Sequence, residues 1–148
     1  MKKQLYIAYG SNLNRAQMSF RCPTAEVVAK SWIHDHRLVF QGAPKGAHAN
    51  VIPAQGCEVP VIIWSITEAD ERALDRYEGV AGGYYTKEYM TLEIDGEMQE
   101  ALVYIMTPHG FGSPDVYYLE TIARGYTDFG LDAETLWDAL AYSAKQTR

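Results

Sequence analysis

The stretch LYIAYGSNL, residues 5–13, joins a strand pattern to a cluster of residues that favour turns. Leu5 to Tyr9 are mostly aliphatic or aromatic, which is typical of a β-strand. Gly10, Ser11 and Asn12 follow directly, and residues of these types tolerate the dihedral angles of tight turns. The pattern predicts a strand that runs straight into a loop whose backbone amides can converge on an acceptor oxygen. An ordinary strand-to-helix turn has the same pattern.

Strand and helix patterns alternate along the rest of the chain. They predict a short helix that Asn12 or Asn14 caps and Pro23 ends, followed by extended segments over 25–40, 50–53 and 59–66 with a bend or bulge at 34–36. A helix that begins at Thr67 and ends at Gly79 comes next. Strands over 84–94 and 98–107 and two helices that begin at Ser113 and Asp132 complete the chain. Asp95-Gly96 predicts a hairpin between the last two strands. Residues 41–49 lack periodicity, so we expect a flexible loop that could border a pocket.

Length and composition indicate one globular domain. The chain has 148 residues, of which 47% are hydrophobic and 22% are charged, close to the globular average. A chain of this length can form its own core, so we expect a single domain over residues 1–148. The formal net charge is -6, and an acidic chain does not attract phosphate groups or anionic lipid. Nucleic acid is therefore not an expected partner.

Targeting signals and metal-binding spacings are not found in the sequence. The N-terminal stretch has only a short apolar run without a cleavage site, and no run approaches the roughly 20 apolar residues of a membrane span. We expect a cytoplasmic protein with no membrane partner. Cys22 and Cys57 are expected to be reduced, partly buried thiols, and His34 and His36 have no third ligand at a recognisable spacing. We expect no metal and no other cofactor.

A glutamate stands at the end of a predicted helix in LDRYEGV, residues 74–80. Glu78 precedes Gly79, so its side chain lies near the negative end of the helix dipole. That position disfavours the charged carboxylate and raises its pKa further if the side chain is buried, as a general base near neutral pH requires. Taken alone, Glu78 is better explained as a solvated surface group.

The two stretches together resemble the γ-glutamylcyclotransferase superfamily. Its members carry a YGSNL loop after the first strand, matched by Tyr9 to Leu13, and a leucine-aspartate segment ending in glutamate-glycine-valine, matched by Leu74 to Val80. Weaker matches are Gly83-Tyr84-Tyr85, Tyr104 to Thr107, and Ser113-Pro114 leading to Tyr118, Ile122 and Gly125. The resemblance therefore covers most of the chain.

This resemblance implies an α+β fold, in which a mixed sheet is curled into a small barrel and flanked by helices. It implies a pocket where the YGSNL loop meets the glutamate segment, with Glu78 as the catalytic residue. The implied substrate-binding residues are Tyr9, Gly10, Ser11, Asn12, Leu13, Tyr85 and Tyr118, and the backbone amides of residues 10–13 are the implied donors. Tyr84 and Tyr117 adjoin two of these tyrosines, and a one-residue alignment error would exchange them.

The implied activity is that of a γ-glutamylcyclotransferase, an amide-cleaving and cyclising acyltransferase that acts on a small γ-glutamyl molecule. The α-amine of the substrate attacks its own γ-carbonyl, so that 5-oxoproline forms and an amine or amino acid is released. Glu78 acts as general acid and base, and such transfer accelerates a reaction about 10²- to 10⁴-fold. The loop amides hold either the developing oxyanion or the α-carboxylate.

Other interpretations use the same residues. A non-catalytic binding or regulatory module would keep the γ-glutamyl pocket but would have no need for Glu78. Removal of a γ-glutamyl protecting group from a biosynthetic intermediate would use identical chemistry. His48 and His109 are either solvated or in contact with substrate, and Arg15 and Arg21 are more readily explained as surface charges than as carboxylate ligands. The leaving amine, the pathway and the oligomeric state are not predicted.

Overall fold

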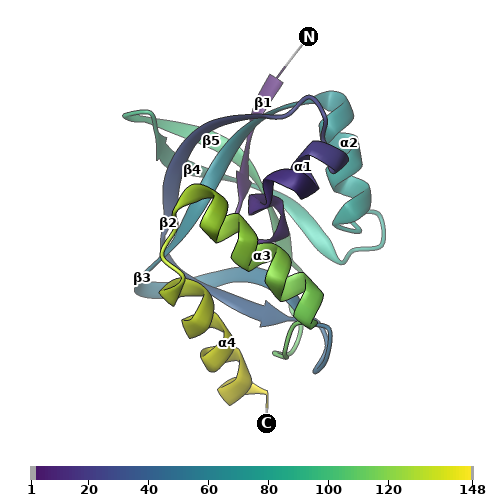
Figure 1. The fold of residues 1–148 in the computed structure, drawn as a ribbon, viewed down its shortest axis with the longest axis vertical. Helices are drawn as coiled ribbons and strands as arrows, with labels where there is room; N and C mark the ends of the chain where they lie inside the picture. Colours follow the sequence, from purple (N-terminus) through teal and green to yellow (C-terminus); the bar gives the residue numbers. More distant parts are fainter. Residues whose placement is uncertain (1–2, 148) are drawn as a thin grey trace.

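A mixed β-sheet forms the centre of the computed structural model, which describes residues 3–147 (Figure 1). Within these residues the sheet has five strands in the order β2-β3-β1-β5-β4. The strands are β1 (Lys3–Ala8), β2 (Glu26–Gln41), β3 (His48–Thr67), β4 (Tyr85–Ile94) and β5 (Glu97–Met106). The helices are the 3-10 helix η1 (Ser11–Leu13), α1 (Arg15–Arg21), α2 (Glu68–Tyr77), α3 (Val116–Phe129) and α4 (Glu134–Gln146). The predicted α+β class is confirmed.

The central strand β1 makes the sheet mixed. It runs antiparallel to β3 and parallel to β5, where Tyr6 pairs with Leu102, whereas β2–β3 and β4–β5 are antiparallel pairs. The two edge strands approach each other, because the Ser31 hydroxyl of β2 donates to the Glu93 carbonyl oxygen of β4 at 2.6 Å. The sheet is therefore curled, and Figure 1 shows α1 and α3 in front of it.

Strand β3 differs from the prediction. The sequence pattern predicts two separate strands over 50–53 and 59–66, and this is wrong, because a single strand spans both segments. Between them, Glu58 pairs with His34 of β2. The predicted irregularity at 34–36 is confirmed by a shift in the register of β2 against β3. There Asp35 has a φ of 56°, and its carboxylate accepts a hydrogen bond from the Gly56 amide at 3.0 Å.

Local signals set the ends of three elements as predicted. Asp95 and Gly96 have φ angles of 53° and 82°, the two positive values that the turn between β4 and β5 requires. Thr67 caps α2 and forms a capping box with Asp70. The Asn14 side chain caps α1. These elements therefore begin and end where short-range hydrogen bonds are satisfied.

The start of α3 corrects one prediction. Ser113 does not cap this helix; Asp115 is the N-cap instead. The amide of Ser113 donates to the Pro44 carbonyl oxygen and its carbonyl oxygen accepts from the Ala47 amide, both at 3.0 Å. The chain at this point therefore bridges to the loop between β2 and β3, and the helix begins only after the bridge ends.

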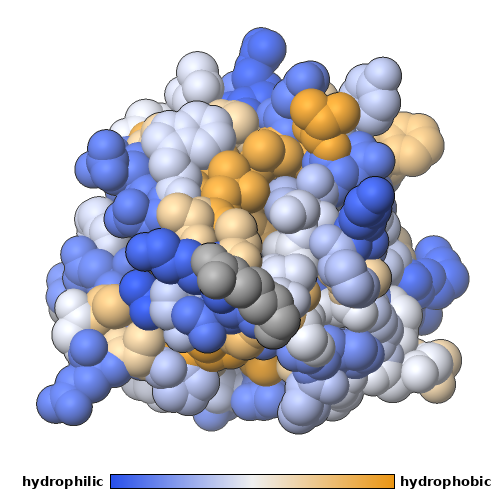
Figure 2. Space-filling model, turned by 90° about the horizontal axis from the view of Figure 1, so that it is seen from below, coloured by the Kyte–Doolittle hydropathy of each residue, from blue (hydrophilic) through white to orange (hydrophobic). Residues whose placement is uncertain are grey.

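The face in Figure 2 is mostly hydrophilic, and neither cysteine forms a disulfide. Figure 2 shows the molecule from below, where hydrophobic residues form a narrow band and most of the coloured surface is hydrophilic. Both cysteines are free thiols, as predicted, and Cys57 is partly buried. Cys22 differs from the prediction because it is fully buried. Within residues 3–147, no helix has the length and apolar character needed to cross a membrane.

Candidate functional site

A cavity opens where the chain leaves β1 and enters η1. The loop residues Tyr9, Gly10, Ser11 and Asn12 line one part of it, and Glu78 lines another. Seven tyrosines contribute to the lining, namely Tyr6, Tyr9, Tyr77, Tyr84, Tyr85, Tyr104 and Tyr118. The two motifs that are far apart in the sequence therefore share one cavity.

Glu78 is the C-cap of α2, and its side chain is partly buried. Its amide donates to the Leu74 carbonyl oxygen at 2.8 Å, and Gly79 then turns the chain with a φ of 64°. Burial raises the pKa of the Glu78 carboxyl from 4.5 to about 7, and the positive charge of Arg21 opposes this rise. Near neutral pH the carboxyl group can therefore both accept and donate a proton.

Side chains of the loop are held by hydrogen bonds to the surrounding tyrosines. The Asn12 side-chain amide donates to the Tyr6 hydroxyl at 2.8 Å, and the Ser11 and Tyr77 hydroxyls are 3.0 Å apart. The backbone amides of Ser11 and Asn12 lie in the first turn of η1, where an N–H has no acceptor within the helix. They donate to no other backbone acceptor within residues 3–147, so they are free to bind a ligand oxygen.

Leu13 does not reach the cavity, although the resemblance implies it as a substrate-binding residue. Its side chain is fully buried in the core, and its amide donates to the Gly10 carbonyl oxygen at 3.0 Å. Helix α3 packs closely on this point, since a Cβ added to Gly125 would lie 2.6 Å from the Leu13 Cβ. Leu13 therefore anchors the loop against α3 and lies apart from Glu78.

Tyr85 and Tyr118 lie in the cavity wall, and both contact the backbone of Ala49 in β3. The Tyr85 hydroxyl donates to the Ala49 carbonyl oxygen at 2.5 Å, and the Tyr118 hydroxyl accepts from the Ala49 amide at 2.9 Å. The Tyr9 hydroxyl donates to the Tyr104 carbonyl oxygen at 2.6 Å. Burial raises the pKa of Tyr9 and Tyr85 well above its usual range, so both hydroxyls stay protonated near neutral pH.

The neighbouring tyrosines differ in position. Tyr117 is 77% exposed and outside the cavity lining, so Tyr118 is the tyrosine that α3 contributes. Tyr84 does line the cavity, together with His48. The His48 Nδ1 and the Tyr84 hydroxyl are 2.8 Å apart, and burial lowers the pKa of His48. His109 packs against the Tyr84 ring, with 5.5 Å between the ring centroids, but is not part of the lining.

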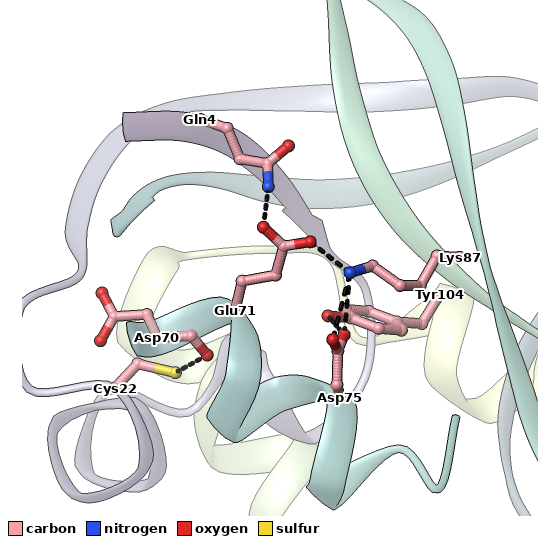
Figure 3. Close-up of polar contacts among 7 residues, drawn as sticks. All are labelled: Gln4, Cys22, Asp70, Glu71, Asp75, Lys87 and Tyr104. Atoms are coloured by element: carbon pink, nitrogen blue, oxygen red, sulfur yellow. Dashed lines mark hydrogen bonds and ion pairs between the residues drawn. The ribbon is translucent and has the colours of Figure 1, made fainter. Parts of the chain in front are cut away.

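A partly buried polar network fixes α2, the helix that ends at Glu78 (Figure 3). The Lys87 ammonium of β4 lies between the carboxylates of Glu71 and Asp75, with 3.1 Å to Asp75. The Tyr104 hydroxyl of β5 donates to Asp75 at 2.7 Å, and the Gln4 side-chain amide of β1 donates to Glu71. Three strands therefore hold one face of α2, which fixes the position of its C-terminal end.

Comparisons with known proteins show the family to which the chain belongs. The family model described as "Gamma-glutamyl cyclotransferase, AIG2-like" matches residues 6–125. The chain belongs to this family. Human gamma-glutamylcyclotransferase is 30% identical over 138 residues, which cover 88% of this chain and 73% of that relative. The bovine gamma-glutamylcyclotransferase is 30% identical over 139 residues, with the same shares of the two chains.

Solved structures of the family have the same fold. A structure described as gamma-glutamyl cyclotransferase has a TM-score of 0.82 at 25% identity and covers 98% of this chain and 86% of its own. The human protein loc79017 has a TM-score of 0.81 at 26% identity, covering 99% of this chain and 87% of its own. The family and the enzyme class that the two motifs indicate are therefore confirmed.

Within residues 3–147, no group of three or more His, Cys, Asp or Glu side chains is arranged to hold a metal ion.

Proposed function

We propose that this protein converts a γ-glutamyl amine or γ-glutamyl amino acid into 5-oxoproline and a free amine, with Glu78 as general acid and base. The observation that carries this proposal is that the Glu78 carboxyl group and the YGSNL loop line the same cavity. The reaction is an acyl transfer within one molecule, because the γ-carbonyl moves from the leaving nitrogen to the α-nitrogen. The proposed substrate is therefore its own nucleophile, and no covalent enzyme intermediate is needed.

Glu78 moves protons between the two nitrogen atoms in this proposal. Its carboxylate takes a proton from the α-ammonium group, and the resulting amine attacks the γ-carbonyl to give a tetrahedral intermediate. The attacking nitrogen loses a second proton as the ring amide forms. The leaving nitrogen gains one proton before its bond to carbon breaks, departs as a neutral amine, and takes up a second proton after release. The two protons that the α-nitrogen loses are thereby balanced, and one carboxyl group can accept and return the proton that cleavage requires. A pKa of about 7 suits this alternation at neutral pH.

Neutral donors would bind the rest of the γ-glutamyl group. The described residues that line the cavity include neither Lys nor Arg. We therefore propose that a substrate oxygen is bound by the free amides of Ser11 and Asn12. Each such donor contributes on the order of 3 kcal/mol if it faces the developing oxyanion. The proposed substrate-binding residues are Tyr9, Gly10, Ser11, Asn12, Tyr85 and Tyr118, all of which line the cavity.

The alternative function is a binding or regulatory module that keeps the γ-glutamyl pocket without catalysis. The position of Glu78 argues against it. A carboxyl group that is partly buried and has a raised pKa costs folding free energy, and a purely binding pocket gains nothing from that cost. A catalyst requires it, because the shifted carboxyl group is the base.

The proposal is tested by product formation from a panel of γ-glutamyl amines, γ-glutamyl amino acids and larger γ-glutamyl conjugates. Mass spectrometry would score 5-oxoproline and the released amine for wild type, Glu78→Gln and Glu120→Gln. Glu120 is exposed on α3 and serves as the matched control. We expect wild type and E120Q to form product and E78Q to be slower by about 10²-fold or more. Equal rates for wild type and E78Q would show that the assigned role is wrong.

The same panel addresses what the leaving group is. General turnover of γ-glutamyl peptides and removal of a γ-glutamyl protecting group differ only in the compound that is cleaved fastest. A cytoplasmic location and a single domain over residues 1–148 stay predictions, which cell fractionation and limited proteolysis would test.

A further inference from the structure

Arg21, the last residue of α1, contacts the YGSNL loop directly. One guanidinium nitrogen of Arg21 donates to the Asn12 side-chain oxygen, and the other donates to the Gln17 side chain at 2.7 Å. The Asn12 amide nitrogen in turn donates to the Tyr6 hydroxyl at 2.8 Å. Arg21 therefore fixes which end of the Asn12 amide points to Tyr6, and with it the orientation of a loop side chain that lines the cavity.

The same guanidinium also contacts the segment that carries Glu78. Its central carbon lies 3.3 Å from the centroid of the Tyr77 ring, and Tyr77 directly precedes Glu78. The Tyr77 hydroxyl is 3.0 Å from the Ser11 hydroxyl of the loop. A flat cation stacked on an aromatic ring is a favourable contact that a lysine reproduces poorly. Arg21 and Tyr77 thus join the two motifs at one edge of the cavity.

Few other charged groups lie near Glu78 besides Arg21. The other titratable groups that share the cavity lining with Glu78 are tyrosines and one histidine, namely Tyr6 and Tyr9 at β1, Tyr77 on α2, Tyr84 and Tyr85 at β4, Tyr104 on β5, Tyr118 on α3, and His48 on β3. Burial raises the pKa of Tyr6, Tyr9, Tyr84, Tyr85, Tyr104 and Tyr118 and lowers that of His48, so these groups are neutral near pH 7. Asp75, one turn earlier in α2, is paired with Lys87. Arg21 is the cation that opposes the effect of burial on Glu78.

We propose that Arg21 is a positioning residue of the site, which holds the YGSNL loop against the Glu78 segment through Asn12 and Tyr77. Its positive charge has a second effect, which is to favour the carboxylate form of Glu78. Its effect on catalysis rests on the proposed function, whereas its effect on the ionisation of Glu78 does not. Arg21 itself does not line the cavity, so it acts through its neighbours. The two parts of the role, contact and charge, can be separated by substitution.

The test compares the pH dependence of kcat/KM in wild type, Arg21→Met, Arg21→Lys and Arg15→Met. Arg15 is the matched control, because it lies on the same helix, is exposed, and stacks 4.3 Å from the Phe129 ring centroid away from the cavity. In R21M we expect the acidic limb of the profile to move up by about one pH unit, which lowers kcat/KM about tenfold at pH 6 and much less at pH 9. R15M should keep the wild-type profile.

Lysine at position 21 separates charge from contact. R21K keeps a cation but loses the flat stacking on Tyr77 and the paired hydrogen bonds, so kcat should fall by a similar factor at every pH while the acidic limb stays near its wild-type position. An R21M limb that coincides with that of wild type would overturn the proposal. If R21M does not fold, Arg21→Gln, which keeps a hydrogen-bond donor without the charge, serves in its place.

Direct titration distinguishes a failure of this proposal from a failure of the proposed function. Carbon-13 NMR of glutamate side chains, with the Glu78 signal assigned by its loss in E78Q, gives the midpoint of Glu78 without any activity measurement. We expect a midpoint near 7 in wild type and a higher one in R21M. Equal midpoints would refute the role of Arg21 even if both proteins are active. If no γ-glutamyl compound gives 5-oxoproline with wild type, the proposed function fails, and the titration still decides the role of Arg21.

Discussion

Replacing Glu78 with glutamine is expected to stabilise the folded protein, because it removes a carboxylate that folding makes harder to ionise. Burial raises the pKa of this carboxyl from 4.5 to about 7. At about 1.4 kcal/mol per pKa unit, the rise corresponds to an upper limit of about 3 kcal/mol. The side chain is only partly buried, and water screens part of the effect. We therefore expect E78Q to be more stable than wild type by about 1–2 kcal/mol at pH 8.

The sign of this effect depends on pH. The folded state binds the Glu78 proton more tightly than the unfolded chain does, so the contribution of this group to stability is fully present below about pH 4.5. It is lost as the pH rises through about 7, and it does not change further above that value. E78Q has no such contribution to lose. The difference between the two free energies of unfolding should therefore grow from near zero at pH 4.5 to its full size at pH 8.

Urea unfolding followed by tryptophan fluorescence would measure these free energies between pH 4.5 and pH 8. Glu120→Gln, the exposed control on α3, should differ from wild type by less than about 0.5 kcal/mol at every pH. A difference between E78Q and wild type that stays constant from pH 4.5 to pH 8 would refute the reasoning, because a constant difference reports side-chain packing and not ionisation.

Two further predictions concern the supports of the site. Gly125→Ala places a Cβ 2.6 Å from the Leu13 Cβ, so we expect the free energy of unfolding, measured in urea, to fall by about 1–3 kcal/mol. The control Gly110→Ala, which has open space around the added Cβ, should have little effect. Lys87→Met leaves the carboxylates of Glu71 and Asp75 without their cation, so we expect the free energy of unfolding at pH 7 to fall by about 1–3 kcal/mol. An unchanged midpoint of urea unfolding would show that the network does not stabilise α2.

The position of Glu78 at a helix end could be predicted from the sequence because the signals are local. Thr67 and Asp70 form the capping box that begins α2, and Gly79 has the positive φ that ends it. Each of these contacts spans only a few residues, so the last residue of the helix is fixed whatever the rest of the chain does. Where that helix end lies relative to β1 is not a local property, and only the family resemblance predicted it.

Some residues at the cavity were not identified from the sequence, because long-range packing decides their positions. Arg21 stacks on Tyr77, which is remote in sequence, and an arginine at a helix end is ordinarily a surface charge. Tyr6 and Tyr104 lie within strands, where an aromatic residue is expected in any case. The chain has 11 tyrosines, and no pattern distinguishes those that face the cavity from those that face solvent.

Leu13 and Ser113 lie elsewhere than their sequence motifs predict, also because of long-range packing. Leu13 belongs to the same motif as the cavity residues, but the absence of a side chain at Gly125 lets α3 cover it. Ser113 precedes a proline, which is a good signal for a helix start, yet its backbone is already paired with the loop before β3. In both cases a contact with a distant segment outweighs the local preference.

The neutrality of the cavity explains why one carboxyl group is sufficient for the proposed chemistry. Burial holds the hydroxyls of Tyr9, Tyr85 and Tyr118 in their protonated form, so they can orient a substrate but cannot take its proton near pH 7. Burial also favours the protonated form of Glu78, and the Arg21 charge opposes this effect. The proton of a substrate ammonium group therefore has one acceptor of matching pKa among these groups. The burial that lowers the stability of the protein at pH 8 is the same burial that makes Glu78 a base near neutral pH.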